Sequence, residues 1–102
     1  MTGFDDKFVH VQAITQHYVF LVDHLDAKNS GLLNQLYQAS VISMEDRETI
    51  DSEVTSWAQN ERLLSILRRK TKDLYDRFLD ALDTTQQQHI REHITALGSV
   101  HL

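Results

Sequence analysis

A chain of 102 residues has room for one domain with its own hydrophobic core. It has no proline, no cysteine and three glycines, which excludes disulfides and Cys-ligated zinc and leaves a multi-turn β architecture without its usual turn residues. The net charge of -5 makes the chain a poor general ligand for nucleic acid. Neither a signal peptide nor an apolar run of membrane-spanning length is visible, so we expect a cytoplasmic protein with no membrane partner.

The first predicted element is one continuous amphipathic helix over residues 7–25. Apolar residues recur along it at the helical period of 3.6, and they are Val11, Ile14, Tyr18, Leu21, Val22 and Leu25. Residues 27–30 form a polar turn, and a short second helix follows with Leu32, Leu33 and Leu36 on its apolar face.

Capping signals mark the starts of the next helices. Ser43 with Asp46 three residues later resembles a capping box and begins a third helix that carries Ile50. Thr55 is a candidate cap for a fourth helix, which contains Leu64 and Leu67. We expect Trp57, on the same helix, to be buried at least partly in the core of the bundle. The alternative is that it anchors an interface with a partner.

Two more helices complete the pattern. Thr71 can cap a fifth helix that carries Tyr75, Phe78 and Leu82. Thr84 or Thr85 is expected to open a sixth, which ends near Gly98. The sequence therefore predicts an all-α fold, a bundle of six helices that forms a single domain over residues 1–102 with its core at about 7–97.

Two charge blocks of opposite sign lie next to each other in the middle of the chain. Residues 45–53 contain five acids and one base, whereas residues 62–72 contain five bases and no acid. On separate sides of one folded unit, these blocks would let copies or relatives dock head to tail, because complementary potentials steer encounter and fix register. The alternative is that both blocks are simply solvated helix faces.

Four segments in this order resemble the caspase recruitment domain, a subfamily of the death fold. They are Val41-Ile42-Ser43 with Asp46 and Ile50, then residues 63–69, residues 74–82, and Gln88-His89-Ile90. The likeness runs from about Val11 to Ile94. Two features depart from the family pattern: Lys70-Thr71 replaces the usual glycine after the basic pair, and His10 and His17 stand where the first helix usually offers arginines.

The resemblance implies a six-helix antiparallel Greek-key bundle with no catalytic activity and no cofactor. Its partners would be other caspase recruitment domains in caspases, adaptors or scaffolds of apoptotic or inflammatory complexes, with a homo-oligomer as a further possibility. In the family, an acidic face on helices 2 and 3 meets a basic face on helices 1 and 4. The predicted acidic face is Glu45, Asp46, Glu48 and Asp51. The predicted basic face is Arg62, Arg68, Arg69 and Lys72, and Glu61 beside Arg62 displaces its positive charge toward Arg68.

Other interpretations remain open at this point. The second hypothesis is a small helical domain that binds nucleic acid through the basic residues at 62–72. The segment from His89 to His93 reads H-x-x-E-H, a zinc-enzyme pattern, although it lacks an evident third ligand and is explained equally well as an ordinary helix. His10, His17 and His24 recur every seven residues, which predicts a half-exposed flank or, alternatively, a face that gains charge below about pH 6.5.

Overall fold

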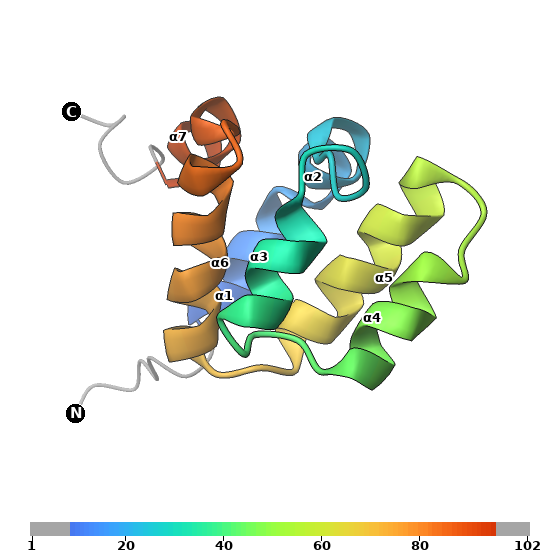
Figure 1. Cartoon of the computed structure of the whole chain (residues 1–102). Coiled ribbons are helices and arrows are strands. Elements are labelled where there is room, and N and C mark those ends of the chain that lie inside the picture. Colours follow the sequence, from blue (N-terminus) through green and yellow to red (C-terminus); the bar gives the residue numbers. More distant parts are fainter. Residues whose placement is uncertain (1–8, 96–102) are drawn as a thin grey trace, which may run out of the picture.

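The computed structural model describes residues 9–95 and folds them into seven α-helices with no strand among these residues (Figure 1). The helices are α1 (Val9–Gln16), α2 (Tyr18–His24), α3 (Leu32–Gln38), α4 (Met44–Asp51), α5 (Ser56–Arg68), α6 (Lys72–Thr84) and α7 (Gln88–Thr95). The predicted all-α class is confirmed. No helix within residues 9–95 has both the length and the apolar character needed to cross a bilayer.

The first predicted helix is divided at His17, so the prediction of one continuous helix is wrong. His17 has φ -108° and ψ 22°, outside the helical region, although its carbonyl still accepts the Leu21 N–H at 2.9 Å. Both halves contact α5, and α1 contacts α6 as well. The bend lets Ile14 and Leu21 both reach full burial. With α1 and α2 counted as one bent helix, the predicted order of six is kept.

Three helix starts are fixed by the predicted caps. Ser43 and Asp46 form a reciprocal capping box with both hydrogen bonds at 3.0 Å. The hydroxyl oxygen of Thr55 accepts the Ala58 N–H at 3.0 Å, and that of Thr71 accepts the Leu74 N–H at 3.3 Å. These bonds satisfy backbone donors that a helix N-terminus otherwise leaves without a partner.

The start predicted for the last helix is wrong. Thr84 is the final residue of α6 and Thr85 is its C-cap, so α7 begins only at Gln88. Between them, Gln86 takes a left-handed φ of 65° and Gln87 turns inward. The buried Gln87 side chain accepts the Asp26 N–H at 2.9 Å, which ties this turn to the loop after α2. The predicted stop at Gly98 lies outside the described residues.

Helix α5 is central to the packing that positions the charged residues. It contacts α1, α2 and α4, while α6 contacts α1, α3 and α7 (Figure 1). The fully buried core is made of aliphatic side chains together with Phe78, and it includes Ile14, Leu21, Leu32, Leu36, Ile50, Leu63, Leu64, Leu67, Leu82 and Ile90. Trp57 does not belong to it. That side chain is 52% exposed in the first turn of α5, so the prediction of a packed tryptophan is wrong.

Candidate interaction surfaces

The two charge blocks lie on neighbouring helices rather than on separate sides of the molecule. The acidic residues 45–51 belong to α4, and the basic residues 62–69 belong to α5 and its C-cap, with Lys72 opening α6. Because α4 packs directly against α5, the blocks meet along one edge. The expected separation of the blocks is therefore wrong for the residues at this edge, and two ion pairs cross it.

The first of these pairs joins Asp46 to Lys70. The Lys70 Nζ atom lies 3.1 Å from Asp46 Oδ2. Both side chains are largely covered, with 28% of Lys70 and 22% of Asp46 exposed. Partial burial alone would raise the pKa of Asp46. The hydrogen bond from the Ser43 N–H and the nearby Lys70 ammonium together lower the pKa by more than burial raises it, so the net shift is downward. Asp46 thus closes the capping box of α4 and holds α4 to the end of α5.

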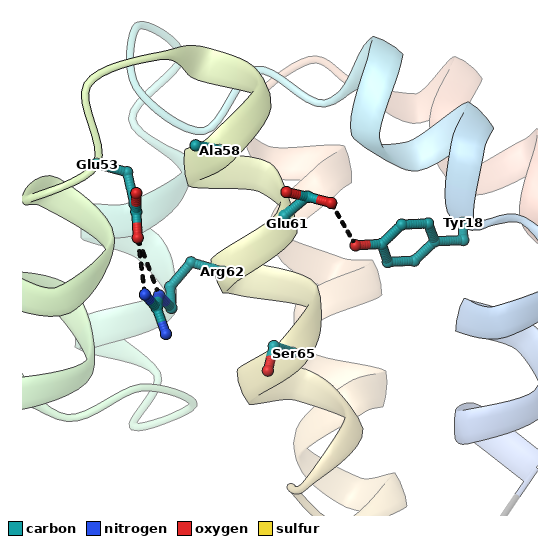
Figure 2. A pocket seen from close by; sticks show the side chains of 6 residues that line it. All are labelled: Tyr18, Glu53, Ala58, Glu61, Arg62 and Ser65. Carbon is teal, nitrogen blue, oxygen red and sulfur yellow. Dashed lines mark hydrogen bonds and ion pairs between the residues drawn. The ribbon is translucent and has the colours of Figure 1, made fainter.

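The second pair joins Glu53 to Arg62. Both Nε and Nη2 of Arg62 donate to the same Glu53 carboxylate oxygen, at 3.2 and 2.8 Å. Figure 2 shows this pair on the α4 side of α5. Glu53 lies in the loop between α4 and α5, so the pair anchors that loop to the helix it precedes. Arg62 is therefore already engaged by a carboxylate of its own chain.

A shallow hollow of about 290 Å³ runs over the outer face of α5 beside this pair. Figure 2 shows Glu61 on its other side, turned toward Tyr18 of α2, whose hydroxyl donates to the Glu61 carboxylate at 3.0 Å. Partial desolvation and then the Glu61 carboxylate raise the pKa of Tyr18. Since the hollow is lined by Glu53, Glu61 and Arg62, its charge is mixed and does not form part of a uniformly basic surface.

The acids that remain available lie on the outward side of α4. Glu45 and Glu48 are exposed and form no ion pair with any residue in the range 9–95. Asp51 is also exposed, and its carboxylate lies 3.6 Å from Arg47 Nε one turn earlier. We call Glu45, Glu48 and Asp51 the α4 acidic surface.

The cations that remain available lie at the C-terminal end of α5, next to α1. Arg68 and Arg69 are exposed, and neither is paired with a carboxylate of residues 9–95; Arg69 makes only a 3.4 Å hydrogen bond to Ser65. They line a hollow of about 400 Å³ together with Val11 of α1 and Ser65. We call Arg68 and Arg69 the α1–α5 basic surface. The predicted fourth member, Lys72, is instead paired with Asp76 at 3.0 Å.

The histidine stripe does not form a half-exposed flank, so that prediction is wrong. His10 is buried, with 2% of its surface exposed, and its ring Nε2 lies 2.6 Å from the Lys70 carbonyl. Because a carbonyl only accepts, His10 must donate from Nε2. His17 is partly buried. Its pKa is lowered mainly by this burial and to a smaller extent by the neighbouring His93. His24 is exposed and stacks on Phe20. These three environments do not make one surface.

The zinc pattern on α7 is explained by packing. Within the described part of the chain, no three or more histidine and carboxylate side chains converge on a point where a metal could bind. The His93 ring stacks on Phe20 of α2 with the ring centroids 3.8 Å apart, which helps to attach α7 to α2. Ile90 and Ile94 on the same helix are buried in the core.

Sequence reasoning missed the roles of Lys70 and Glu53. Both were counted only as members of their charge blocks, although each is bound to a member of the opposite block. The capping box at Ser43 was a usable signal, because it fixed which way the Asp46 side chain faces. No comparable signal in the sequence indicated the partner of Arg62.

Comparison with known proteins agrees with this architecture. The family description "Caspase recruitment domain" matches residues 11–97, which is most of the chain. Caspase-2 of Gallus gallus is 29% identical over 85 residues, covering 83% of this chain and 20% of the relative. The chain therefore spans about a fifth of the length of this relative.

Proposed function

Because this chain belongs to the caspase recruitment domain family, we propose that it binds other domains of the family through the α1–α5 basic surface and the α4 acidic surface. Domains of this family are protein-interaction modules that join one another through homotypic contacts in caspase-related signalling. We further propose that the chain itself is not an enzyme and that residues 1–102 act as one domain in the cytoplasm. Its partners would be caspase recruitment domains of caspases, adaptors or scaffolds, or further copies of itself.

One observation carries the assignment of surfaces. Arg68 and Arg69 are exposed at a hollow beside α1 without a carboxylate partner within residues 9–95, so their charge is available to a second molecule. Asp46, Arg62 and Lys72 are each engaged by an ion pair in their own chain. Asp51 also contacts a base of its own chain, Arg47, but at 3.6 Å this pair is longer than the other three, so Asp51 is kept. Of the eight residues predicted from the sequence, five remain in the proposal: Glu45, Glu48, Asp51, Arg68 and Arg69.

The energetics favour assembly by several weak contacts. An exposed ion pair contributes about 0.2–1 kcal/mol, so two or three across one interface give at most a few kcal/mol. Apolar contact at Val11, which lines the same hollow as the arginines, would add to this. Such an interface supports lasting association only when several copies engage at once, and this suits a module that is built into an assembly.

The nucleic-acid alternative finds no support. Of the five bases in residues 62–72, Arg62, Lys70 and Lys72 are already paired with carboxylates. Two available arginines fall well below the roughly six to ten phosphate contacts of a typical DNA-binding protein. A basic stripe able to follow a nucleic-acid backbone is therefore not formed.

A charge-swap experiment tests the proposed surfaces. The probe is a second, tagged copy of this chain, together with the 85-residue segment of chicken caspase-2 that aligns with it. We expect R68E/R69E to lower binding at least about tenfold, equivalent to about 1.4 kcal/mol, while the melting temperature stays unchanged. The control R68K/R69K keeps the charge and should retain most of the binding.

The complementary variant separates a surface effect from a general one. If two copies join basic surface to acidic surface, E45K/E48K should restore binding to R68E/R69E, because the signs of both surfaces are exchanged. Binding of both probes that survives the double arginine reversal would show that the basic surface is misassigned. Rescue by E45K/E48K would identify α4 as the opposing surface.

A further inference from the structure

The basic surface ends directly at an exposed threonine. Arg68 and Arg69 precede Thr71 by three and two residues, with Lys70 between them and the acceptor. Many protein kinases select serine or threonine by arginines at these two positions, because acidic groups around the kinase cleft pair with them. We propose that Thr71 is the phosphoacceptor of an arginine-directed protein kinase, and that its phosphate switches off the basic surface. The second part of this inference rests on the proposed function.

The position of Thr71 suits modification. It is exposed in the short connection between α5 and α6, and its backbone is extended, with φ -78° and ψ 164°. The residue before it has left the helix, since Arg69 is the C-cap of α5. For a kinase to bind the arginines in an extended form, the final turn of α5 must open, with its bonds from Arg69 to Ile66 and from Lys70 to Leu67. The contacts of Lys70 with His10 and Asp46 must be released at the same time. Helix ends are the part of a fold that opens most readily.

Two other residues show what is particular to Thr71. Thr55 has the same capping role at the start of α5, but the residues before it include Asp51 and Glu53, which such a kinase disfavours. Ser65 has an arginine three residues before it, yet it lies in the middle of α5, and that arginine, Arg62, is held by Glu53. Thr71 alone among these three combines arginines, exposure and a position outside a helix interior.

The transfer itself is an ordinary phosphoryl transfer from ATP. The Thr71 hydroxyl oxygen forms a bond to the γ-phosphorus, the bond from that phosphorus to the β–γ bridging oxygen breaks, and ADP leaves. The hydroxyl proton passes to the catalytic carboxylate of the kinase. Nothing in this chain takes part beyond the acceptor and the arginines that the kinase recognises.

The consequence follows from charge. A phosphothreonine carries about -1.5 to -2 at pH 7, which matches the two positive charges of Arg68 and Arg69 that have no carboxylate partner among residues 9–95. Arginine pairs well with phosphate, so both side chains would turn to it rather than to a second molecule. The fold tolerates the group, because the N-terminus of α6 favours negative charge and the phosphate oxygens can replace the hydroxyl as cap.

The experiment uses the full chain and the catalytic subunit of an arginine-directed kinase with ATP. Thr71→Asn is the matched variant, because asparagine caps a helix as well as threonine but accepts no phosphate. We expect intact-mass measurement to find one phosphate on the native chain and none on T71N, with fragmentation placing it on Thr71. Absence of phosphate on the native chain, its persistence in T71N, or its location at Ser65 would overturn the inference.

Binding is then compared for phosphorylated and unphosphorylated protein with the same two probes. We expect at least tenfold weaker association after phosphorylation, and full binding by T71N treated with kinase and ATP. Equal binding of the two forms would overturn the regulatory role while leaving the proposed function intact. Failure of the unphosphorylated chain to bind either probe would instead count against the proposed function. The regulatory part of the inference would then fail too, even if the mass measurement shows a phosphate on Thr71.

Discussion

The two sides of α5 are attached to their neighbours by different chemistry. On the side of α1 and α2, the buried Asn60 side chain donates to the carbonyls of Val22 and Leu25 at 2.8 and 2.9 Å. On the side of α4, a hydrogen bond from the buried Gln59 side chain to the Glu53 carbonyl, at 3.1 Å, is joined by two partly exposed ion pairs, Asp46–Lys70 and Glu53–Arg62. Buried amides therefore make hydrogen bonds on both sides, whereas among residues 9–95 the ion pairs that attach α5 lie only on the side of α4.

This difference determines which charges are available for binding. Where α5 meets α4, opposite charges satisfy one another within the chain. Where α5 meets α1, no carboxylate of the described residues pairs with Arg68 or Arg69. Both arginines are therefore available to another molecule. The sign of a sequence block therefore indicates the local potential, but internal pairing decides whether a partner can use it.

Removing the amide should have the largest effect on stability. Asn60→Ala leaves the last carbonyls of the bent first helix without their donors, which should cost about 2–4 kcal/mol in the free energy of unfolding. Urea unfolding followed by circular dichroism measures it. Ser65→Ala, an exposed change on the same helix, is the control and should stay within about 0.5 kcal/mol. A loss for N60A as small as that of the control would mean that water replaces the amide.

Removing Asp46 should have an intermediate effect that separates its two roles. Asp46→Ala loses both the capping box and the Lys70 pair, which should cost about 1–2 kcal/mol. Asp46→Asn keeps an oxygen that can accept the Ser43 N–H and loses only the charge, so its cost should stay below about 1 kcal/mol. Equal losses in the two variants, measured by urea unfolding, would contradict a contribution from the cap.

The contribution of the Asp46 charge should also depend on pH. Since folding lowers the pKa of Asp46 below its ordinary value of 3.8, the unfolded chain binds this proton more readily, and the stabilisation is complete above that value. It is lost as the pH falls through the lower pKa of the folded state. The stability difference between the native chain and D46N should therefore stay constant from about pH 6 to pH 5 and shrink as the pH falls below about 4. In a K70M background the same difference should be smaller at pH 6, because the ammonium that lowers the pKa is gone.

Local features could be predicted from the sequence because they depend on a few adjacent residues. Ser43, Thr55 and Thr71 cap their helices as expected, since a cap needs only a side-chain oxygen and donors two or three residues later. The apolar period likewise identified Ile14, Leu64 and Phe78 as core. The family resemblance added the order and the class of the fold.

Features that depend on how helices pack against each other could not be predicted. Asp46 and Lys70 are 24 residues apart, and only the register of α4 against α5 brings them together. The break at His17 interrupts one amphipathic pattern whose two halves both contact α5, while the first half also contacts α6. Trp57 follows the apolar spacing of α5, but it lies in the first turn of that helix, where Ser56 is also exposed, just after the exposed loop residue Val54.

The smallest expected effect tests whether internal pairing withholds a charge from partners. Glu53→Gln removes the carboxylate that holds Arg62, at a cost to stability below about 1 kcal/mol because the pair is partly exposed. The released guanidinium then adds a third available cation to α5, so binding to an acidic partner surface should tighten about two- to fivefold at low salt. The gain should fade as ionic strength rises toward physiological values, where exposed charges are screened within about 8 Å. Arg62→Gln is the matched control, because it breaks the same pair but releases the Glu53 carboxylate in place of a cation, so it should not tighten binding to an acidic partner surface and should weaken it slightly at low salt. Tightening by both variants would mean that loss of the pair loosens the α4–α5 loop, and that the charge of Arg62 has no part in binding.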